Sequence, residues 1–210
     1  MIVKICGVND AAAFDAVVDA QADFLGLVFF PASPRFVTAV QAQALSVRHD
    51  GGPRRVGLFV KPSDAEIGAV LDVLKLDVLQ VYADAARARE IKARFGLPVW
   101  RAIGVAAEHD LPADDEGLDG FVIEAKPPVG ATRPGGNAIK MDWSLLKSWE
   151  APGFWLLGGG LNQENIGRAI RESGALAVDV SSGVETAPGK KSPSLIAAFV
   201  ATAKFMGTKG

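Results

Sequence analysis

A single cysteine stands where its thiol could take part in acid–base chemistry. Cys6 ends the apolar run 2–6 and is followed by Gly7. Because side chains alternate between the two faces of a strand, Lys4 is expected to share the inward face with Cys6, one layer deeper. A buried ammonium group favours the thiolate, so the sequence predicts a Cys6 pKa lowered from about 8.5 toward neutrality. A plain buried cysteine is the alternative interpretation.

Two polar residues near the other end of the chain extend this hypothesis. Asp179 belongs to the apolar run 176–180 and Ser181 follows it, so the two side chains share one face of a strand. In a closed barrel the last strand neighbours the first. We therefore predict an interior ion pair between Lys4 and Asp179 that helps to set the charge around Cys6. If the pair exists, an Asp179→Asn variant should have a shifted pH–rate profile.

A carboxyl group and a guanidinium group follow two other apolar runs. Glu124 ends the run 121–124, where burial would raise its pKa and suit it to act as a general acid. The alternative is a rim residue paired with Lys126. Arg35 lies in the rigid, proline-containing segment 31–36. Its guanidinium either binds a substrate carboxylate through two hydrogen bonds or pairs with a surface acid.

Two glycine-containing segments follow the last two apolar runs. One holds Gly159 and Gly160, and the other holds Ser182 and Gly183. In (β/α)8 barrels the loops after the seventh and eighth strands, together with a short extra helix, commonly bind phosphate. Glycine suits this role because it lets backbone N–H groups approach the anion. Either segment alone is as easily a tight turn, but the two together predict a phosphate site.

Several common functional motifs are missing from the sequence. His49 and His109 are the only histidines, and both stand in polar surroundings, so a histidine-based triad or a metal cluster is not expected. The segment 183–191 is not a P-loop, because five residues separate its glycines and no serine or threonine follows its first lysine. The glycines at 158–160 lack the spacing of a dinucleotide-binding fingerprint. We therefore expect no metal and no organic cofactor.

A regular alternation of strands and helices must position these residues. Short apolar runs predict strands at residues 2–6, 24–29, 55–60, 78–81, 98–103, 121–124, 154–157 and 176–180. Segments of helical periodicity lie at residues 10–19, 40–47, 63–74, 84–95, 143–149, 163–172 and 193–205, with a weak one near 108–111. Asn9 and Ser63 are predicted N-caps, with Glu66 completing a capping box, and Gly96 and Gly174 are predicted to end helices.

Repeated strand–helix units require a parallel sheet covered by helices. About eight units in 210 residues come near the lower size limit of a (β/α)8 TIM barrel, and a doubly wound open sheet has the same local pattern. The two predicted phosphate loops favour the barrel. No linker divides the chain, so we expect one α/β domain over residues 1–210. The segment 125–140, rich in proline and glycine, is expected to be an active-site loop.

The composition narrows the class of protein further. With 49% apolar residues, one cysteine and a net charge of −2, the chain is neither disordered nor a disulfide-stapled scaffold. A charge so close to zero argues against nucleic acid or a membrane as the partner. No secretory signal is recognised, so we expect a cytoplasmic protein that binds a small phosphorylated molecule and acts as a monomer or homodimer.

The motifs together identify a family. In order and spacing the chain resembles the phosphoribosylanthranilate isomerases of tryptophan biosynthesis over nearly its whole length. The matching stretches are Lys4-Ile-Cys-Gly7, Ser33-Pro-Arg35, Val56-Gly-Leu-Phe-Val60, Leu79-Gln80, Gly135-Gly136, Asp142-Trp143, Gly159-Gly160-Leu161-Asn162 and Val178-Asp-Val-Ser-Ser-Gly-Val-Glu185. The resemblance implies a TIM barrel that performs the Amadori rearrangement of N-(5-phosphoribosyl)anthranilate without metal or organic cofactor.

The resemblance also implies roles for individual residues. Cys6 corresponds to the general base that removes the C2′ proton, and Glu124 stands where the family has an aspartate that protonates the furanose ring oxygen. Arg35 matches the residue that holds the anthranilate carboxylate. The remaining matches are the phosphate-binding Gly159, Gly160, Ser182 and Gly183 and the supporting Lys4, Gln80 and Asp179. Tyr82 is a further supporting residue, although it does not match the family pattern.

Two departures from the family pattern leave alternatives open. Where the family usually reads Leu-Gln-Leu-His-Gly, this chain has Tyr82 and Ala83 in place of the histidine and glycine, and Glu124 adds one methylene to the acid. One alternative is an isomerase of another phosphosugar, for which Arg35→Ala would be harmless if the substrate lacks a carboxylate. The other is a catalytically silent protein that binds a phosphorylated ligand and tolerates Cys6→Ser.

Overall fold

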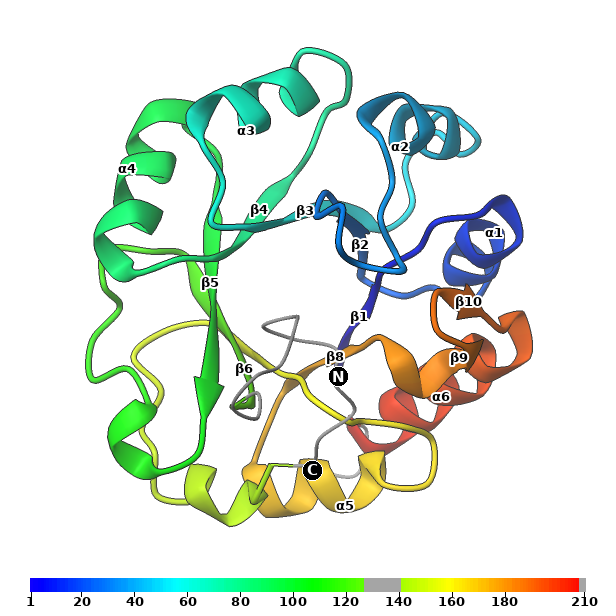
Figure 1. The fold of residues 1–210 in the computed structure, drawn as a ribbon. Helices are drawn as coiled ribbons and strands as arrows, with labels where there is room; N and C mark the ends of the chain where they lie inside the picture. Colours follow the sequence, from blue (N-terminus) through cyan, green and yellow to red (C-terminus); the bar gives the residue numbers. More distant parts are fainter. Residues whose placement is uncertain (127–140, 208–210) are drawn as a thin grey trace.

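The strands form a closed parallel barrel in a computed structural model that describes residues 1–126 and 141–207 (Figure 1). Within these residues the barrel strands, in chain order around it, are β1 (Ile2–Cys6), β2 (Phe24–Val28), β3 (Arg54–Val60), β4 (Val78–Tyr82), β5 (Val99–Val105), β6 (Gly120–Ala125), β7 (Trp155–Leu157) and β8 (Ala177–Val180). Closure is made by β1, which pairs with both β2 and β8. The predicted (β/α)8 barrel is thus confirmed, and the open sheet is wrong.

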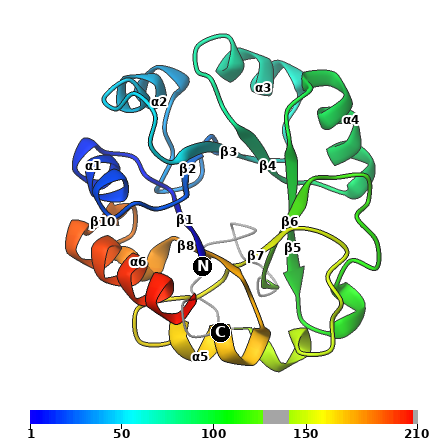
Figure 2. The same cartoon turned by 180° about the vertical axis from the view of Figure 1, so that it is seen from behind.

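Helices surround the barrel as an outer ring (Figures 1 and 2). They are α1 (Ala11–Asp19), α2 (Ala39–Ser46), α3 (Asp64–Leu71), α4 (Ala85–Phe95), α5 (Ile166–Ser173) and α6 (Pro193–Gly207), with 3-10 turns η1 (Glu108–Asp110), η2 (Trp143–Leu146) and η3 (Ser182–Val184). The predicted helix at 143–149 is only the turn η2. Gly96 and Gly174 end α4 and α5 in the left-handed conformation, as predicted.

The N-caps show how local sequence starts these helices. Ser63 caps α3, and its hydroxyl accepts from the N–H of Glu66 while that carboxylate accepts from the N–H of Ser63, which confirms the capping box. The prediction for Asn9 is wrong. The cap of α1 is Asp10, whose carboxylate accepts from the N–H of Ala13 at 2.8 Å, because the helix begins one residue later than expected.

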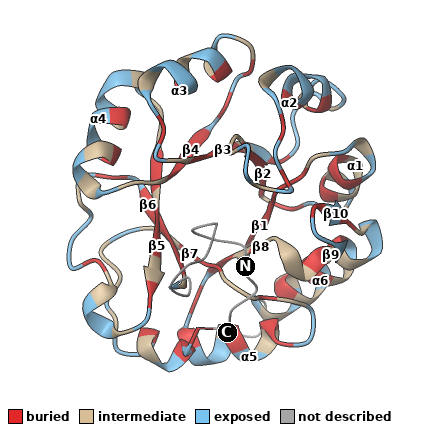
Figure 3. Ribbon diagram, in the orientation of Figure 1, coloured by how far each residue is buried: buried red, intermediate tan, exposed pale blue. Residues whose placement is uncertain are grey.

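Buried residues concentrate in the strands of the barrel, whereas exposed residues lie mainly on the surrounding helices and loops (Figure 3). Toward the N-terminal ends of the strands an apolar cluster fills the barrel and consists of Phe24, Val56, Val78, Trp100, Ala102, Val122, Leu156 and Ala177. Lys4 and Gln80, fully buried, come next along β1 and β4. Strand alternation then brings Cys6 and Tyr82 to the C-terminal ends. From the N-terminal to the C-terminal ends of the strands, the barrel interior therefore changes from apolar side chains to buried polar side chains and then to the side chains of Cys6 and Tyr82.

A small antiparallel hairpin follows β8 and was not predicted. It consists of β9 (Glu185–Ala187) and β10 (Lys190–Lys191). Its sequence is polar and carries no alternating apolar pattern, so periodicity gave no signal. Most of the predicted loop 125–140, with Gly135-Gly136, lies outside the described residues. In the described part of the chain, no helix has the length and apolar character needed to span a membrane.

Candidate active site

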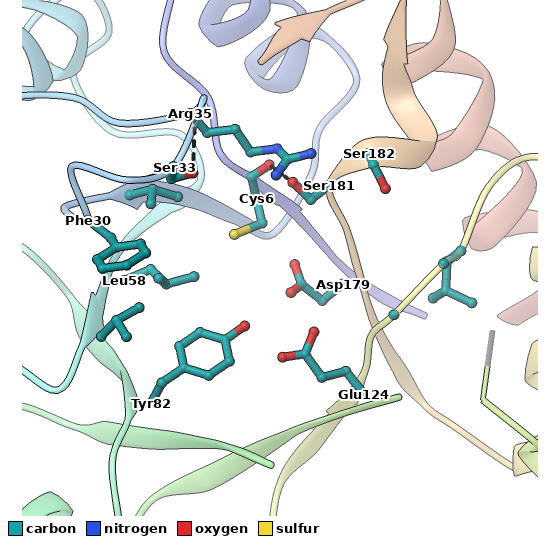
Figure 4. Close-up of a pocket in the computed structure, with 15 residues that line it drawn as sticks. Cys6, Phe30, Ser33, Arg35, Leu58, Tyr82, Glu124, Asp179, Ser181 and Ser182 are labelled. Carbon is teal, nitrogen blue, oxygen red and sulfur yellow. Dashed lines mark hydrogen bonds between the residues drawn. The ribbon is translucent and has the colours of Figure 1, made fainter. Parts of the chain in front are cut away.

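One pocket opens at the C-terminal ends of the barrel strands (Figure 4). Of the predicted site residues, those that line it are Cys6, Arg35, Tyr82, Glu124, Gly159, Gly160, Asp179 and Ser182. Lys4 and Gln80 are buried deeper in the barrel, and Gly183 packs against the carbonyl oxygen of Leu161 without lining the pocket. Lining residues that were not predicted include the apolar Val28, Phe30, Leu58, Val60 and Leu161. The pocket therefore combines an apolar wall with buried ionisable groups.

Cys6 ends β1 with its sulfur inside the pocket (Figure 4). The facing glycine of β2, Gly26, leaves room for it, since a Cβ there would lie 2.9 Å from Sγ. One layer below, the Nζ of Lys4 lies 2.9 Å from a carboxylate oxygen of Asp179, and Lys4 is fully buried. The strand register places these two residues side by side on β1 and β8. The predicted interior ion pair is confirmed.

The prediction for the acidity of Cys6 is wrong. Burial raises the pKa of the thiol, and although the ammonium of Lys4 lowers it, the carboxylate of Asp179 raises it again. An ion pair of no net charge stabilises a thiolate only weakly, whereas the cost of desolvating the thiolate remains. The pKa of Cys6 therefore lies above its ordinary value, and Cys6 is mainly a thiol at neutral pH.

An Asp179→Asn variant tests this balance of charges. We expect the pKa of Cys6 to fall, because the thiolate becomes the counter-ion of Lys4, and we expect the free energy of unfolding to drop by about 3–5 kcal/mol. Since Cys6 is the only cysteine, the pH dependence of alkylation by iodoacetamide reports its pKa directly. Asp72→Asn, at an exposed position, is the control. An unchanged alkylation profile in Asp179→Asn would contradict the coupling.

Glu124 lies near the end of β6 and is 6% exposed. Burial raises its pKa to about 7, although an interaction with the hydroxyl of Tyr82 lowers it in part. Among the described residues, its Oε1 has no hydrogen-bond partner. Lys126 does not pair with it, because the Nζ of Lys126 lies 3.0 Å from Asp110. The expected rise in pKa is confirmed, and the alternative pairing is wrong.

Tyr82 stands at the end of β4 and points its hydroxyl toward the carboxyl of Glu124 (Figure 4). Burial, with the nearby Glu124, raises the pKa of Tyr82 well above 10, so the hydroxyl remains a proton-bearing donor. Gln80 lies below it, with its Oε1 buried and without a hydrogen-bond partner in the described residues. The residue that replaces the family histidine thus contributes a neutral donor beside the acid.

Arg35 borders the pocket, but part of its guanidinium is already bound. Its Nε and Nη2 donate to the two carboxylate oxygens of Glu185 at 2.7 and 2.9 Å. The predicted pairing of Arg35 with an acid is confirmed, but the acid is not at the surface, because the side chain of Glu185 is only 4% exposed. Gly7 leaves space for the arginine stem, since a Cβ there would lie 2.4 Å from its Cδ. Glu185 and its second partner, Lys191, were missed because a charged pair in a polar segment leaves no periodic signal.

The two glycine-containing loops lie against each other beside the pocket. Gly159 and Gly160 have positive φ angles of 79° and 67°. A Cβ on Gly159 would lie 2.9 Å from the backbone nitrogen of Ala125, and one on Gly183 would lie 1.8 Å from the carbonyl oxygen of Leu161. Only glycine permits this contact. The loops after β7 and β8 therefore present backbone groups to the same side of the pocket.

The chain is similar to known proteins over nearly its whole length. The family model described as N-(5'phosphoribosyl)anthranilate (PRA) isomerase matches residues 3–202. The isomerase of that name from Acidiphilium cryptum is 57% identical over 200 residues, covering 95% of this chain and 97% of that protein. The phosphoribosyl anthranilate isomerase structure from Thermotoga maritima is 33% identical, with a TM-score of 0.84 over 98% of this chain and 100% of the other.

A further solved structure shows such an isomerase with a ligand. It is a phosphoribosyl anthranilate isomerase in complex with reduced 1-(o-carboxyphenylamino)-1-deoxyribulose 5-phosphate. It is 31% identical, with a TM-score of 0.81 over 98% of this chain and 100% of that chain. From the extent of the family match and the identity of these relatives, the chain belongs to the N-(5'-phosphoribosyl)anthranilate isomerase family.

Proposed function

We propose that this chain catalyses the Amadori rearrangement of N-(5-phosphoribosyl)anthranilate to 1-(2-carboxyphenylamino)-1-deoxyribulose 5-phosphate in tryptophan biosynthesis. The observation that carries the proposal is a buried thiol and a buried carboxyl group facing one pocket at the C-terminal ends of the strands. An isomerisation of this kind needs one proton donor and one proton acceptor. The related isomerase with bound reduced product adds support for a small phosphorylated ligand.

The first chemical step assigns the acid role to Glu124. Its protonated carboxyl donates to the furanose ring oxygen, the bond from C1′ to that oxygen breaks, and the lone pair of the anthranilate nitrogen forms a Schiff base. The raised pKa of about 7 keeps much of Glu124 protonated near neutral pH. The hydroxyl of Tyr82 orients the carboxyl from the side of β4. Glu124 is left as a carboxylate after this step.

The second step assigns the base role to Cys6. Its thiolate removes the proton from C2′, and the electrons of that C–H bond move toward C1′ and neutralise the Schiff base nitrogen. The resulting enolamine becomes the ketose when its hydroxyl loses a proton and C1′ gains one. Because its pKa is raised, only a small fraction of Cys6 is ionised near neutral pH, but the thiolate that does form is a stronger base. Lys4 and Asp179 below it keep the interior neutral overall.

The two pKa values determine the pH dependence. The productive form has Glu124 protonated and Cys6 deprotonated, although Cys6 has the higher pKa of the two. Below pH of about 7, kcat/KM rises with pH because more thiolate forms. Between the two pKa values the gain of thiolate is balanced by the loss of the Glu124 proton, so kcat/KM is level. Above the pKa of Cys6 it falls.

The ends of the substrate are assigned to two other groups. Arg35 binds the anthranilate carboxylate, while Phe30, Leu58 and Val60 provide an apolar wall for the aromatic ring. The phosphate is assigned to the loops that carry Gly159, Gly160, Ser182 and Gly183, where backbone N–H groups approach closely. This arrangement holds C1′ and C2′ of the sugar between the acid and the base.

A fluorescence assay tests the function. Freshly generated phosphoribosylanthranilate should be consumed by the purified protein, and its fluorescence should decay faster than the spontaneous breakdown recorded without protein. No acceleration, while other aminated phosphosugars are isomerised, would favour the alternative substrate. Tight binding without turnover of any of them would favour the silent binding protein.

A further inference from the structure

The hairpin after β8 brings a buried carboxylate between two cations. Its register pairs Glu185 on β9 directly with Lys191 on β10, and the Nζ of Lys191 lies 2.7 Å from Oε1 of Glu185. The same carboxylate accepts from Nε and Nη2 of Arg35. Lys191 has a fully buried side chain, and Glu185 and Arg35 are nearly as buried. One carboxylate from the hairpin therefore holds an arginine from the loop after β2.

The geometry of a guanidinium explains what this contact achieves. Arginine presents its N–H donors along two edges of a planar fork. Glu185 occupies the edge made by Nε and Nη2, so the plane of the fork and its rotation are both set. No hydrogen bond joins Nη1 to another described residue, and Arg35 lines the pocket, so the edge that includes Nη1 remains available to a ligand. By binding one edge of the guanidinium through two hydrogen bonds, Glu185 thus orients the other edge of Arg35 toward a ligand.

The hairpin also supports the backbone of the arginine loop. Its turn residue Gly189 has a φ of +78°, and a Cβ there would lie 2.2 Å from the carbonyl oxygen of Pro34, next to Arg35. The N–H of Gly189 donates to Oε2 of Glu185 at 3.3 Å. The turn, the carboxylate and the arginine loop are therefore packed as one unit.

Lys191 connects this unit to the thiol strand. Its Nζ donates to the carbonyl oxygen of Ser181 at 2.9 Å, and the hydroxyl of Ser181 donates to the carbonyl oxygen of Cys6 at 3.0 Å. Burial raises the pKa of Glu185, but the hydrogen bonds from Arg35 and the charge of Lys191 outweigh it, so Glu185 stays ionised. Burial lowers the pKa of Lys191, although Glu185 raises it in part. Arg35 and Lys191 share one carboxylate, and this leaves positive charge beside the pocket that suits an anionic ligand group.

We propose that Glu185, held by Lys191 on the β9–β10 hairpin, is a positioning residue that orients Arg35 toward the carboxylate of the ligand. This inference rests on the proposed role of Arg35. Glu185 does not touch the ligand itself; it acts through the fork of Arg35. Loss of its charge frees the fork to rotate, and the arginine then contributes less to the recognition of the carboxylate.

The test compares two ligands by isothermal titration calorimetry. One is reduced 1-(2-carboxyphenylamino)-1-deoxyribulose 5-phosphate, and the other is the same compound with an unsubstituted phenyl ring. The ratio of their dissociation constants measures carboxylate recognition and does not depend on the fraction of folded protein. We expect Glu185→Gln to reduce the wild-type preference for the carboxylated ligand by about tenfold or more, the size of a lost charge-assisted hydrogen bond. Lys190→Gln, exposed on the same hairpin, should leave it unchanged.

The outcomes separate the inference from the proposed function. An unchanged preference in Glu185→Gln, or equal loss for both ligands, overturns the positioning role. In an Arg35→Ala background, Glu185→Gln should have no further effect on the preference, and an additional loss there also overturns it. A wild-type protein that does not prefer the carboxylated ligand refutes the assignment of Arg35 itself. If Glu185→Gln does not fold, Glu185→Asp keeps the charge on a shorter stem and should show a smaller loss of preference.

Discussion

Replacing Cys6 with serine is expected to lower kcat by about two to four orders of magnitude, the usual contribution of a positioned general base. Serine nearly matches the shape of cysteine, but its hydroxyl does not ionise in the pH range where the thiolate forms. The effect should fall on kcat, because in the proposed reaction Cys6 acts on the C–H bond and contributes little to binding. Steady-state kinetics with phosphoribosylanthranilate provide the measurement.

Two controls make the Cys6→Ser result specific. The dissociation constant of the reduced product analogue should stay close to that of the wild type, which shows that the pocket is intact. Cys6→Ala should be as inactive as Cys6→Ser, because neither supplies a base. Substantial turnover by Cys6→Ser would remove the base role from Cys6 and leave the silent or alternative-substrate interpretation.

Replacing Glu124 with glutamine is expected to lower kcat/KM by about two to four orders of magnitude and to change the shape of its pH profile. An amide cannot donate the proton that opens the ring. In the wild type we expect kcat/KM to level off near a pH of about 7, because burial raises the pKa of Glu124 to that value. The residual activity of Glu124→Gln should instead keep rising through that pH, up to the raised pKa of Cys6.

Glu124→Asp is the matched variant for this experiment. It keeps an ionisable acid but withdraws the carboxyl by one methylene, and a misplacement of about 1 Å costs about a hundredfold in rate. We expect activity between those of the wild type and Glu124→Gln, with the levelling of the pH profile preserved. A Glu124→Gln profile that still levels near neutral pH would assign that titration to another group.

Much of the barrel was predictable because parallel strands buried on both sides are short apolar runs. The strand at 2–6 matches β1, and the Lys4–Asp179 pair followed from side-chain alternation and barrel closure alone. Helix ends were predictable where one residue type dominates, as at Gly96. The helix predicted at 143–149 is a 3-10 turn, because apolar spacing over so few residues also fits a single turn packed on the barrel.

The electrostatics of the site were only partly predictable. The sequence placed Lys4 near Cys6, but the sign of the pKa shift depends on how completely Asp179 cancels that charge and on how dry the site is. Neither the cancellation of charge by Asp179 nor the degree of burial can be read from the spacing of residues in the sequence. The contact between Arg35 and Glu185 joins residues 150 positions apart through a polar hairpin, so no local pattern indicates it. Tertiary packing determines which distant charged residues come into contact, so a pair of this kind is found only in the three-dimensional structure.

The raised pKa of Cys6 has a consequence for the durability of the protein. Peroxide and disulfides react with thiolates far faster than with thiols. A sulfur that is protonated for most of its lifetime, and that is nearly enclosed, is oxidised to sulfenic acid slowly. The same burial that raises the pKa of Cys6 is therefore expected to protect the single cysteine of the chain from peroxide and from mixed disulfides.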